Sequence, residues 1–443
     1  MRNRIRAAHA TAWLLGGATF VVSGSAMAAA CPVDSNTVYM SGSTAFSPVL
    51  QSLVNVLTAI GSPVKIVSQK PGSCEGLDPV VNHTGDTHSA SLLVANATAM
   101  PCDLPQAGAT VDIGISDVYP STCRATFDTS LPDLGAAFAD FLGPIQAITI
   151  AVPTNSSENL ISAEAAHVVF GFDAATAANT IAPWSIPGDI YVRFWDSGTL
   201  ELVGAAIKLP GGKWANATTT PAPPQQQSGG GALATALVTS GNMAGHTNST
   251  IGILGTANLT TGIKPLAFQG VGQSCSYLPD STSSAADKIN VRQGRYTIWG
   301  PEHLVTNVDG SGKPVGQNNN TAAVQTVING LTSTSKALPS QSDAGAGDGG
   351  VTSLGESDVG QIITTIAKPS IGFIPWCAMQ VQRTSEIGAE SSYAPPAACT
   401  CAYEYATGAP VTGHTCTACT AQNAATTCIG ATPACHFGYC EAE

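Results

Sequence analysis

The stretch Ser41-Gly42-Ser43-Thr44-Ala45-Phe46-Ser47-Pro48 joins a strand-like segment at residues 37–40 to a well-signalled helix. Ser47 is a favourable N-cap residue, and Pro48 suits the first helical position. Apolar residues then recur at helical spacing as far as Ile60, and Gly61 ends the helix. Small hydroxyl residues at a helix start, beside unpaired backbone amides, can bind an oxyanion. The stretch therefore predicts a strand–loop–helix unit that forms one part of an anion site.

The first 28 residues have the organisation of a secretory signal peptide. Basic residues come first, an apolar stretch follows at residues 11–22, and Ala26-Met27-Ala28 matches a cleavage site. We therefore expect an exported, soluble protein of the periplasm, the extracellular space or the cell surface. The alternative is a lipoprotein acylated at Cys31, which is less favoured because Ala28 stands where that signal prefers a larger aliphatic residue.

The chain contains 13 Cys, and export makes disulfides their expected fate. Six are spread between Cys31 and Cys377, and seven crowd residues 399–440. The count is odd, so an acylated Cys31 would leave an even number for pairing. The spacing does not reveal which cysteines pair. Cysteines and histidines of the C-terminal segment can also be interpreted as zinc ligands, but disulfides are favoured, and we expect no metal and no cofactor.

Charge limits the classes of partner. The formal net charge is −12, from 17 Lys and Arg against 29 Asp and Glu, and the basic residues are nowhere clustered. This pattern argues against binding to nucleic acid or to an anionic membrane surface. An anion site in this chain must therefore be local, built from backbone amides, hydroxyl groups and a single Arg.

Strand-like and helical segments alternate along the chain, which predicts βαβ units and mostly parallel sheets. Strands are expected at residues 37–40, 64–68, 111–116, 144–152, 190–194, 251–254 and 296–299, and helices at 49–60, 162–170, 233–238, 324–331 and 359–366. The continuous apolar segment 144–152 is expected to be a buried parallel strand. Residues 218–228 and 340–350 are expected to be loops. Within the second loop, Gly345–Gly350 matches a dinucleotide-binding pattern by letter only, because no strand precedes it.

Four polar clusters follow strands or begin helices, which is where open α/β sheets bind ligands. They are Ser43-Thr44, Ser73, Ser116-Asp117, and Arg193 with Ser197-Gly198-Thr199. Each cluster taken alone is more typical of a turn, a cap or a surface salt bridge. Their combination offers hydroxyl groups, small-residue amides, one guanidinium and one carboxylate, which together suit an oxyanion.

The order of these clusters resembles that in the phosphate-binding proteins of bacterial ABC transporters, which have the type II periplasmic binding fold. The matching motifs are Gly42-Ser43-Thr44, Ser73 within Gly72–Gly76, Asp112-Ile-Gly114-Ile-Ser116-Asp117, and Arg193-Phe-Trp-Asp-Ser197-Gly198-Thr199. The resemblance covers residues 37 to 300, with a looser fit to 390, and leaves out the cysteine-rich end. The chain departs from the family at Trp195-Asp196, where the family places Asp and then Gly, and at Glu75, which brings a negative charge beside Ser73.

The resemblance implies an α/β protein with two lobes, mostly parallel sheets and a small cysteine-rich C-terminal module. Lobe 1 would comprise residues 31–142 and 300–396, lobe 2 residues 143–299, and the disulfide tail residues 397–443. The residues expected to bind the ligand are Ser43, Thr44, Ala45, Ser73, Asp117, Arg193, Ser197, Gly198 and Thr199. In this scheme hydroxyl groups, amides and Arg193 donate to phosphate oxygens, and Asp117 accepts a hydrogen bond from a protonated phosphate oxygen.

The function implied is capture of inorganic phosphate by a monomeric exported binding protein that supplies an ABC permease. Sulfate carries no proton at neutral pH, so Asp117 would discriminate against it. The alternatives are another oxyanion, such as sulfate or molybdate, and an extracellular interaction or adhesion protein on the same scaffold. A hydrolase is less favoured, because the sequence has no Gly-x-Ser-x-Gly or His-Glu-x-x-His motif and its His residues are scattered. We therefore expect no enzymatic activity.

Overall fold

The computed structural model describes residues 28–126, 131, 134–171, 181–211, 213–215, 225–333, 354–408 and 415–441. The expected signal peptide lies outside these residues except for Ala28, as do Gly345–Gly350 and most of the loop 218–228. Within the part of the chain described, no helix combines the length and apolar character needed to cross a bilayer.

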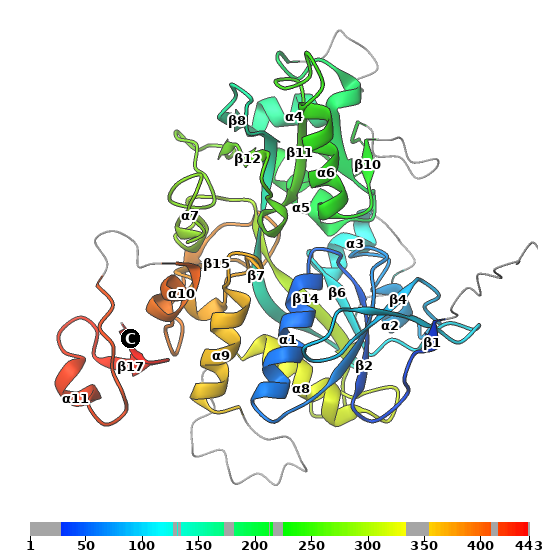
Figure 1. Cartoon of the computed structure of the whole chain (residues 1–443), viewed down its shortest axis with the longest axis vertical. Coiled ribbons are helices and arrows are strands. Elements are labelled where there is room, and N and C mark those ends of the chain that lie inside the picture. The colour runs from blue at the N-terminus through cyan, green and yellow to red at the C-terminus, as the bar shows by residue number, and fades with distance from the viewer. Residues whose placement is uncertain are drawn as a thin grey trace, which may run out of the picture.

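Two long strands at the centre of the molecule connect its two lobes. Strand β7 (Phe138–Pro153) pairs antiparallel with β14 (Trp299–Asn307) along nearly the whole of β14. β14 then pairs with a strand of the first lobe, and β7 pairs with strands of the second. The result is one 12-stranded sheet that runs through both lobes, whose main path has the order β1-β5-β4-β3-β2-β6-β14-β7-β11-β9-β10. Figure 1 shows β7 and β14 between the blue and green parts of the chain.

The first lobe is built on three parallel strands, β2 (Thr37–Gly42), β3 (Lys65–Gln69) and β6 (Ile113–Ser116). Its antiparallel edge strands are β4 (Ala90–Leu93) and β5 (Met100–Asp103), with β1 (Ala29–Ala30) beyond them. Helices α1 (Ser47–Ala59), α8 (Thr321–Thr332) and α9 (Glu356–Ile366) share one apolar core with these strands. Leu53, Val327 and Ile362 are examples of its buried side chains.

The second lobe repeats this plan. Its parallel strands are β9 (Ile190–Arg193), β10 (Gln226–Gln227) and β11 (Ile251–Gly255), and its helices are α4 (Ala163–Gly171), α5 (Gly198–Ile207) and α6 (Gly230–Gly241). The small strands here are β8 (Leu160–Ser162), β12 (Ile263–Pro265) and β13 (Ala267–Gln269). The remaining elements are α2 (Asp78–Val81), α3 (Pro120–Thr126), α7 (Ile289–Arg292), β15 (Val381–Gln382), β16 (Ser391–Ser392), α10 (Thr400–Thr407), α11 (Ala424–Thr427), β17 (Ala434–His436) and β18 (Tyr439–Glu441).

This architecture confirms the predicted α/β class with two lobes and a cysteine-rich C-terminal region. The strands that lead into the four polar clusters each have a parallel neighbour, as predicted, but the sheet is mixed rather than mostly parallel, because β14 pairs antiparallel with β6 and β7 and because β4 pairs antiparallel with β3 and β5. The expectation that residues 144–152 form a parallel strand is wrong, because β7 pairs antiparallel with β14, β11 and β12. β7 is buried from Gly143 to Pro153 because it lies mid-sheet, and this burial gives the apolar sequence that parallel strands also have.

The start of α1 also differs from expectation. Ser47 is the first helical residue, Phe46 occupies the N-cap position, and no side chain caps the helix. The Ser47 hydroxyl instead donates to the Thr44 carbonyl oxygen at 3.0 Å. Ser47 therefore stabilises the preceding loop, although the helix begins where the sequence predicts.

Six disulfides account for twelve of the cysteines: Cys31–Cys102, Cys74–Cys123, Cys377–Cys399, Cys401–Cys416, Cys419–Cys435 and Cys428–Cys440. The remaining cysteine is Cys275, an exposed free thiol. The alternative that Cys31 is acylated is contradicted, because its Sγ is already bonded to Cys102. The odd cysteine of the count is Cys275 and not Cys31.

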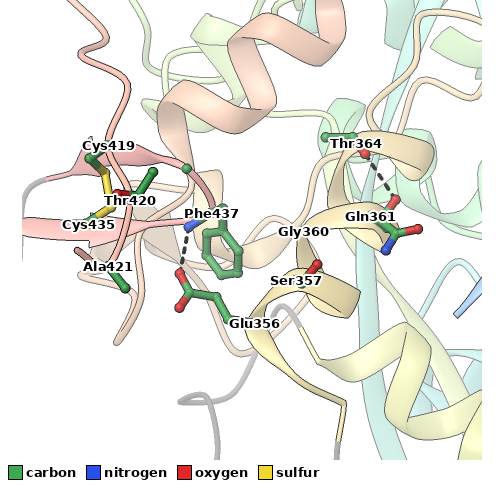
Figure 2. Close-up of a pocket in the computed structure, with 11 residues that line it drawn as sticks. Glu356, Ser357, Gly360, Gln361, Thr364, Cys419, Thr420, Ala421, Cys435 and Phe437 are labelled. Carbon is green, nitrogen blue, oxygen red and sulfur yellow. Dashed lines mark hydrogen bonds between the residues drawn. A yellow bond between two sulfur atoms is a disulfide. The ribbon is translucent and has the colours of Figure 1, made fainter. Parts of the chain in front are cut away.

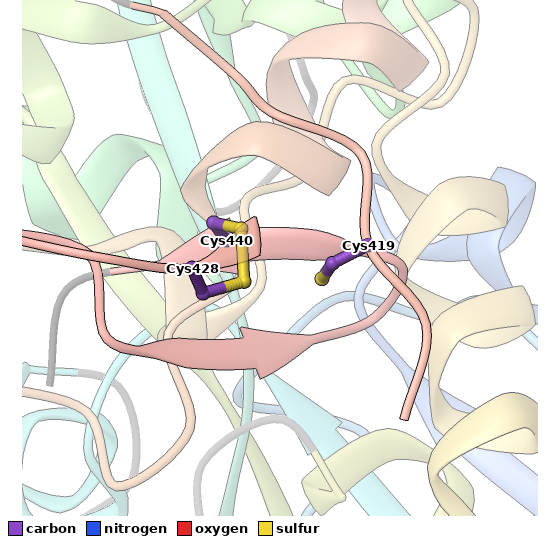
Figure 3. Close-up of side chains that lie close together, drawn as sticks. All are labelled: Cys419, Cys428 and Cys440. Carbon is purple, nitrogen blue, oxygen red and sulfur yellow. A yellow bond between two sulfur atoms is a disulfide. The ribbon is translucent and has the colours of Figure 1, made fainter. Parts of the chain in front are cut away.

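The C-terminal region consists of a helix in the core and a disulfide-linked hairpin outside it. Helix α10 is tied to the body by Cys377–Cys399, and its Tyr403 packs in the large core. The hairpin β17–β18 follows, beside α9 in Figure 1. Figure 3 shows that Cys419, Cys428 and Cys440 lie close together, with sulfur atoms within 4.8 Å of one another. All three are in disulfides, so they offer no thiolate to a metal ion.

Candidate functional site

The polar clusters meet where the two lobes face each other. Thr44 follows β2, Ser73 follows β3 and Asp117 follows β6, so all three come from the carboxyl ends of parallel strands in the first lobe. Arg193 is the last residue of β9 in the second lobe, and Thr199 lies in the first turn of α5. Hydrogen bonds connect these five residues across the boundary between the lobes.

Arg193 is the centre of the site. Its side chain is 2% exposed, and its Nη2 donates to Thr44 Oγ1 at 3.0 Å and to the Ser228 carbonyl oxygen at 2.9 Å. Nε donates to the Gln227 carbonyl oxygen at 3.2 Å, and Nη1 to Thr199 Oγ1 at 3.4 Å. Burial lowers the pKa of Arg193, whereas the negative charges of Asp117 and Asp196 oppose that shift. An Arg keeps its charge under these conditions, so the site contains a fixed buried cation.

Asp117 supplies the acceptor of the site. Its Oδ2 accepts a hydrogen bond from Thr199 Oγ1 at 2.9 Å, and its backbone N–H donates to Ser73 Oγ at 3.3 Å. Its Oδ1 is buried and has no hydrogen-bond partner among the described residues. A buried carboxylate oxygen needs a donor, which a ligand or the neighbouring Glu302 carboxyl on β14 can supply.

Gly198 allows the two lobes to approach at this point. A Cβ added there would lie 2.7 Å from Ser73 Oγ and 2.8 Å from Asp117 Cβ, which is closer than real Cβ atoms come. Gly198 is therefore needed for the close contact between α5 and the Ser73 loop. This role is steric and is separate from the donor role that the sequence predicts.

The other expected site residues lie next to this network with their polar groups engaged locally. The Ser43 N–H donates to the Ile115 carbonyl oxygen at 3.0 Å, and the Ala45 N–H donates to Ser43 Oγ at 3.2 Å. The Ser197 N–H donates to the Phe194 carbonyl oxygen at 3.0 Å. In this closed arrangement Ser43, Ala45 and Ser197 shape the loops, whereas Thr44, Ser73, Asp117, Arg193 and Thr199 form the connected network.

Two buried polar residues of the connecting strands were missed by the sequence analysis, and one of them, Glu302, lies beside Asp117. Glu302 on β14 is 0% exposed, and neither carboxyl oxygen has a hydrogen-bond partner in the described part of the chain. Burial, then the charge of the neighbouring Asp117 carboxylate, and then a side-chain hydrogen bond that a protonated Glu302 can make with Asp117 raise the pKa of Glu302 well above its usual value. Gln146 on β7 is equally buried, and its amide atoms also have no partner among the described residues. The sequence signal that could have identified these two residues was the presence of a Glu and a Gln within long, otherwise apolar strands.

A second concave feature lies far from these residues. Figure 2 shows a groove between α9 and the C-terminal hairpin, with the Phe437 ring directed toward Gly360. Its volume is about 450 Å³, and most of its lining is polar or small, including Ser357, Gln361 and Thr364. The Phe437 N–H donates to Glu356 at 2.7 Å, which fixes the hairpin against α9. The groove holds no unpaired buried charge, so it lacks the chemistry found around Arg193.

No protein-family model matches the sequence, and no curated protein matches it. Among solved structures, a phosphate ABC transporter substrate-binding protein with bound phosphate from Clostridium perfringens is 12% identical, with a TM-score of 0.42 over 66% of this chain and 93% of that chain. A phosphate-binding protein from Stenotrophomonas maltophilia is 14% identical, with a TM-score of 0.40 over 79% of this chain and 91% of the other. An ABC-type phosphate transport receptor from Vibrio cholerae is 12% identical, with a TM-score of 0.38 over 62% and 88%. At these identities and TM-scores, the ligand must be argued from the site itself.

Proposed function

We propose that this chain is an exported solute-binding protein that captures inorganic phosphate between its two lobes. The observation that carries the proposal is the pairing of a buried guanidinium, Arg193, with a buried carboxylate, Asp117, whose Oδ1 has no partner among the described residues. A ligand that satisfies both must accept hydrogen bonds and also donate one. A protonated phosphate does both, because it has several acceptor oxygens and one O–H group.

The donors around this position are suited to an oxyanion. Arg193 supplies charge-assisted hydrogen bonds, and Thr44, Ser73 and Thr199 supply hydroxyl groups from both lobes. In the present arrangement these groups bind one another, as the Arg193–Thr44 bond at 3.0 Å illustrates. Phosphate would exchange those bonds for its own, with the Ser43, Ala45, Ser197 and Gly198 segments adjusting around it. Lobe closure around a ligand is a common motion of two-lobed proteins.

Selectivity follows from Asp117. Sulfate has no proton at neutral pH, so its oxygen would face the Asp117 carboxylate with no hydrogen between them. The cost of burying such an unsatisfied acceptor is about 1–3 kcal/mol and rises when the groups are charged. The site should therefore prefer phosphate and arsenate to sulfate and molybdate.

We further propose that the protein acts as a monomer, with lobe 1 formed by residues 31–142 and 300–396 and lobe 2 by residues 143–299. Its expected place is the periplasm or the cell surface, where an ABC permease would receive the ligand. Within this proposal the C-terminal hairpin is a disulfide-stabilised addition to the first lobe, held against α9 by the Phe437–Glu356 bond.

Isothermal titration calorimetry with phosphate, arsenate, sulfate and molybdate tests this function on the purified mature protein. We expect tight binding of phosphate and arsenate and much weaker binding of sulfate and molybdate. Arg193→Ala should weaken binding of every anion, because it removes the only cation hydrogen-bonded within the network. Arg295→Ala is the matched control, since Arg295 is exposed and lies outside the site. Absence of heat with phosphate, or unchanged binding in Arg193→Ala, would rule the proposal out.

A further inference from the structure

The two positions at which the sequence departs from the resembled family face each other across the boundary between the lobes. Asp196 lies in the loop between β9 and α5, in the second lobe, and Glu75 lies in the loop after β3, in the first. The Cys74 N–H donates to the Asp196 carbonyl oxygen at 3.2 Å, which fixes the two loops together. A Cβ on Gly72 would lie 2.4 Å from Asp196 Oδ2, so the Asp196 carboxyl is pressed against the Glu75 loop.

These two carboxyl groups have different surroundings. Asp196 is 4% exposed, whereas the Glu75 side chain is 42% exposed. His88 lies on the other side of Glu75, with its Nε2 at 3.1 Å from Glu75 Oε1, and its Nδ1 lies 2.7 Å from Asp86 Oδ1. Because His88 is placed between Glu75 and Asp86, it stabilises the negative charge of Glu75. A proton in the Asp196–Glu75 pair is therefore expected on Asp196.

The pKa shifts of Asp196 and His88 agree with a proton on Asp196. Burial, and then the charge of Glu75, raise the pKa of Asp196 to about 7, while Arg193 acts in the opposite direction. The pKa of His88 is raised by Asp86 and Glu75, although burial opposes that shift. The charged groups that act on Asp196 are thus Glu75 from the first lobe and Arg193 from its own lobe.

We propose that Asp196 and Glu75 hold one solvent-derived proton between the lobes when the site is closed, so that capture of the anion takes up a proton. When the lobes separate, Asp196 regains water and releases the proton to solvent. The pair thereby determines how affinity varies with pH, a property separate from the selectivity of Asp117. This inference rests on the proposed function for its ligand and for an open form of the ligand-free protein, whereas the closed form carries the contact between the two loops with or without a ligand.

The direction of the pH dependence follows from the raised pKa. Asp196 has an ordinary value of 3.8 when exposed and about 7 when closed against Glu75. The closed form is therefore favoured at low pH, and the advantage is lost as the pH rises through 7. Between these two values, affinity should fall by up to about tenfold for each pH unit. Above about pH 8 the pair is fully ionised, and this contribution no longer changes.

Asp196→Asn tests the proposal, because an amide mimics the protonated carboxyl at every pH. We expect the variant to bind phosphate about tenfold more tightly than wild type at pH 5 and about a thousandfold more tightly at pH 8, with no difference below about pH 3. The ionisation of phosphate itself cancels, because both proteins are compared at the same pH. Calorimetry at pH 6 in two buffers of different ionisation enthalpy should show wild type taking up about one proton more than the variant. Asp103→Asn, at an exposed aspartate of β5, is the matched control.

A ligand-free measurement separates this inference from the proposed function. Without phosphate, Asp196→Asn should unfold at a higher temperature than wild type, and the gap should widen between pH 5 and pH 8. If phosphate does not bind but this gap appears, the proposed function fails and the shared proton stands. If phosphate binds but neither affinity nor stability differs between the two proteins at pH 8, the shared proton is refuted. Glu75→Gln should reproduce part of the gap, since it removes the repulsion by Glu75 but leaves the burial of Asp196 unchanged.

Discussion

Asp117→Asn is the substitution that most directly examines how the site distinguishes its ligands. Asp117 is buried, its Oδ2 accepts from Thr199 Oγ1 at 2.9 Å, and its Oδ1 has no partner among the described residues. Asparagine has the same shape, and its carbonyl oxygen can keep the Thr199 bond. Its amide nitrogen then takes the place of the free Oδ1 and presents a donor where the wild type presents an acceptor.

The expected magnitude comes from the cost of an unsatisfied acceptor. In the wild type, this one contact should make the binding free energy of sulfate about 1–3 kcal/mol less favourable than that of protonated phosphate. This difference corresponds to about 5- to 150-fold in affinity. In Asp117→Asn the amide donates to either anion, so most of that difference disappears. Sulfate should bind more tightly than in wild type, while phosphate loses the bond that its proton made. The two affinities should converge to within about fivefold.

Competition calorimetry at pH 7, with sulfate displaced by phosphate, measures this ratio in both proteins. Arg193→Ala serves for comparison, because it should weaken both anions and leave their ratio nearly unchanged. A ratio that stays as large in Asp117→Asn as in wild type would refute the reasoning. In that case Oδ1 does not meet the ligand, and the discrimination lies elsewhere.

Three further substitutions examine the frame around the site. Glu302→Gln should leave phosphate affinity within about threefold of wild type if Glu302 is neutral, whereas a loss above about tenfold in calorimetry would mean that its charge is used. Cys74→Ser with Cys123→Ser removes a bridge with a sequence separation of 49, and should lower the free energy of unfolding by about 4 kcal/mol in urea titrations. Glu404→Gln breaks the buried pair with Arg292, whose atoms lie 3.1 Å apart, and should lower the free energy of unfolding by about 3–5 kcal/mol, against a small change for the exposed Glu164→Gln. Equal stability of Glu404→Gln and wild type would contradict the importance of α10 to the core.

Local signals sufficed for much of the fold. The strand at 37–40 and the helix after Ser47 occur as β2 and α1, because propensity, Pro48 and apolar spacing all agree there. The direction of β7 could not be obtained in the same way. A fully buried strand has the same apolar composition whether its neighbours run parallel or antiparallel, and its partners β14 and β11 lie about a hundred residues or more away.

The site was predictable where its residues follow strands. Thr44, Ser73, Asp117 and Arg193 end or follow strands, and the sheet brings such ends together. Glu302 and Gln146 lie inside strands, where a single polar residue carries no positional signal. The surroundings of Asp196 were also not predictable, and the described hydrogen bonds of the nearby Arg193 go to Thr44, Thr199 and two carbonyl oxygens. Packing of the lobes decided that Asp196 faces Glu75.

The acidic composition of the chain raises the question of how this site could bind an anion. The protein has a net charge of −12, and Asp117 and Asp196 lie near Arg193, with Glu302 beside Asp117 and Glu75 beside Asp196. If every one of these carboxyl groups were ionised, their field would repel any anion. Burial raises the pKa of Glu302 and of Asp196, so both can be neutral at or below pH 7, while His88 offsets the charge of Glu75. Under the proposed function, the charges left to act on phosphate would be the Arg193 cation and the Asp117 carboxylate. The carboxyl groups near Arg193 are therefore compatible with anion capture because protons, rather than further basic residues, neutralise them.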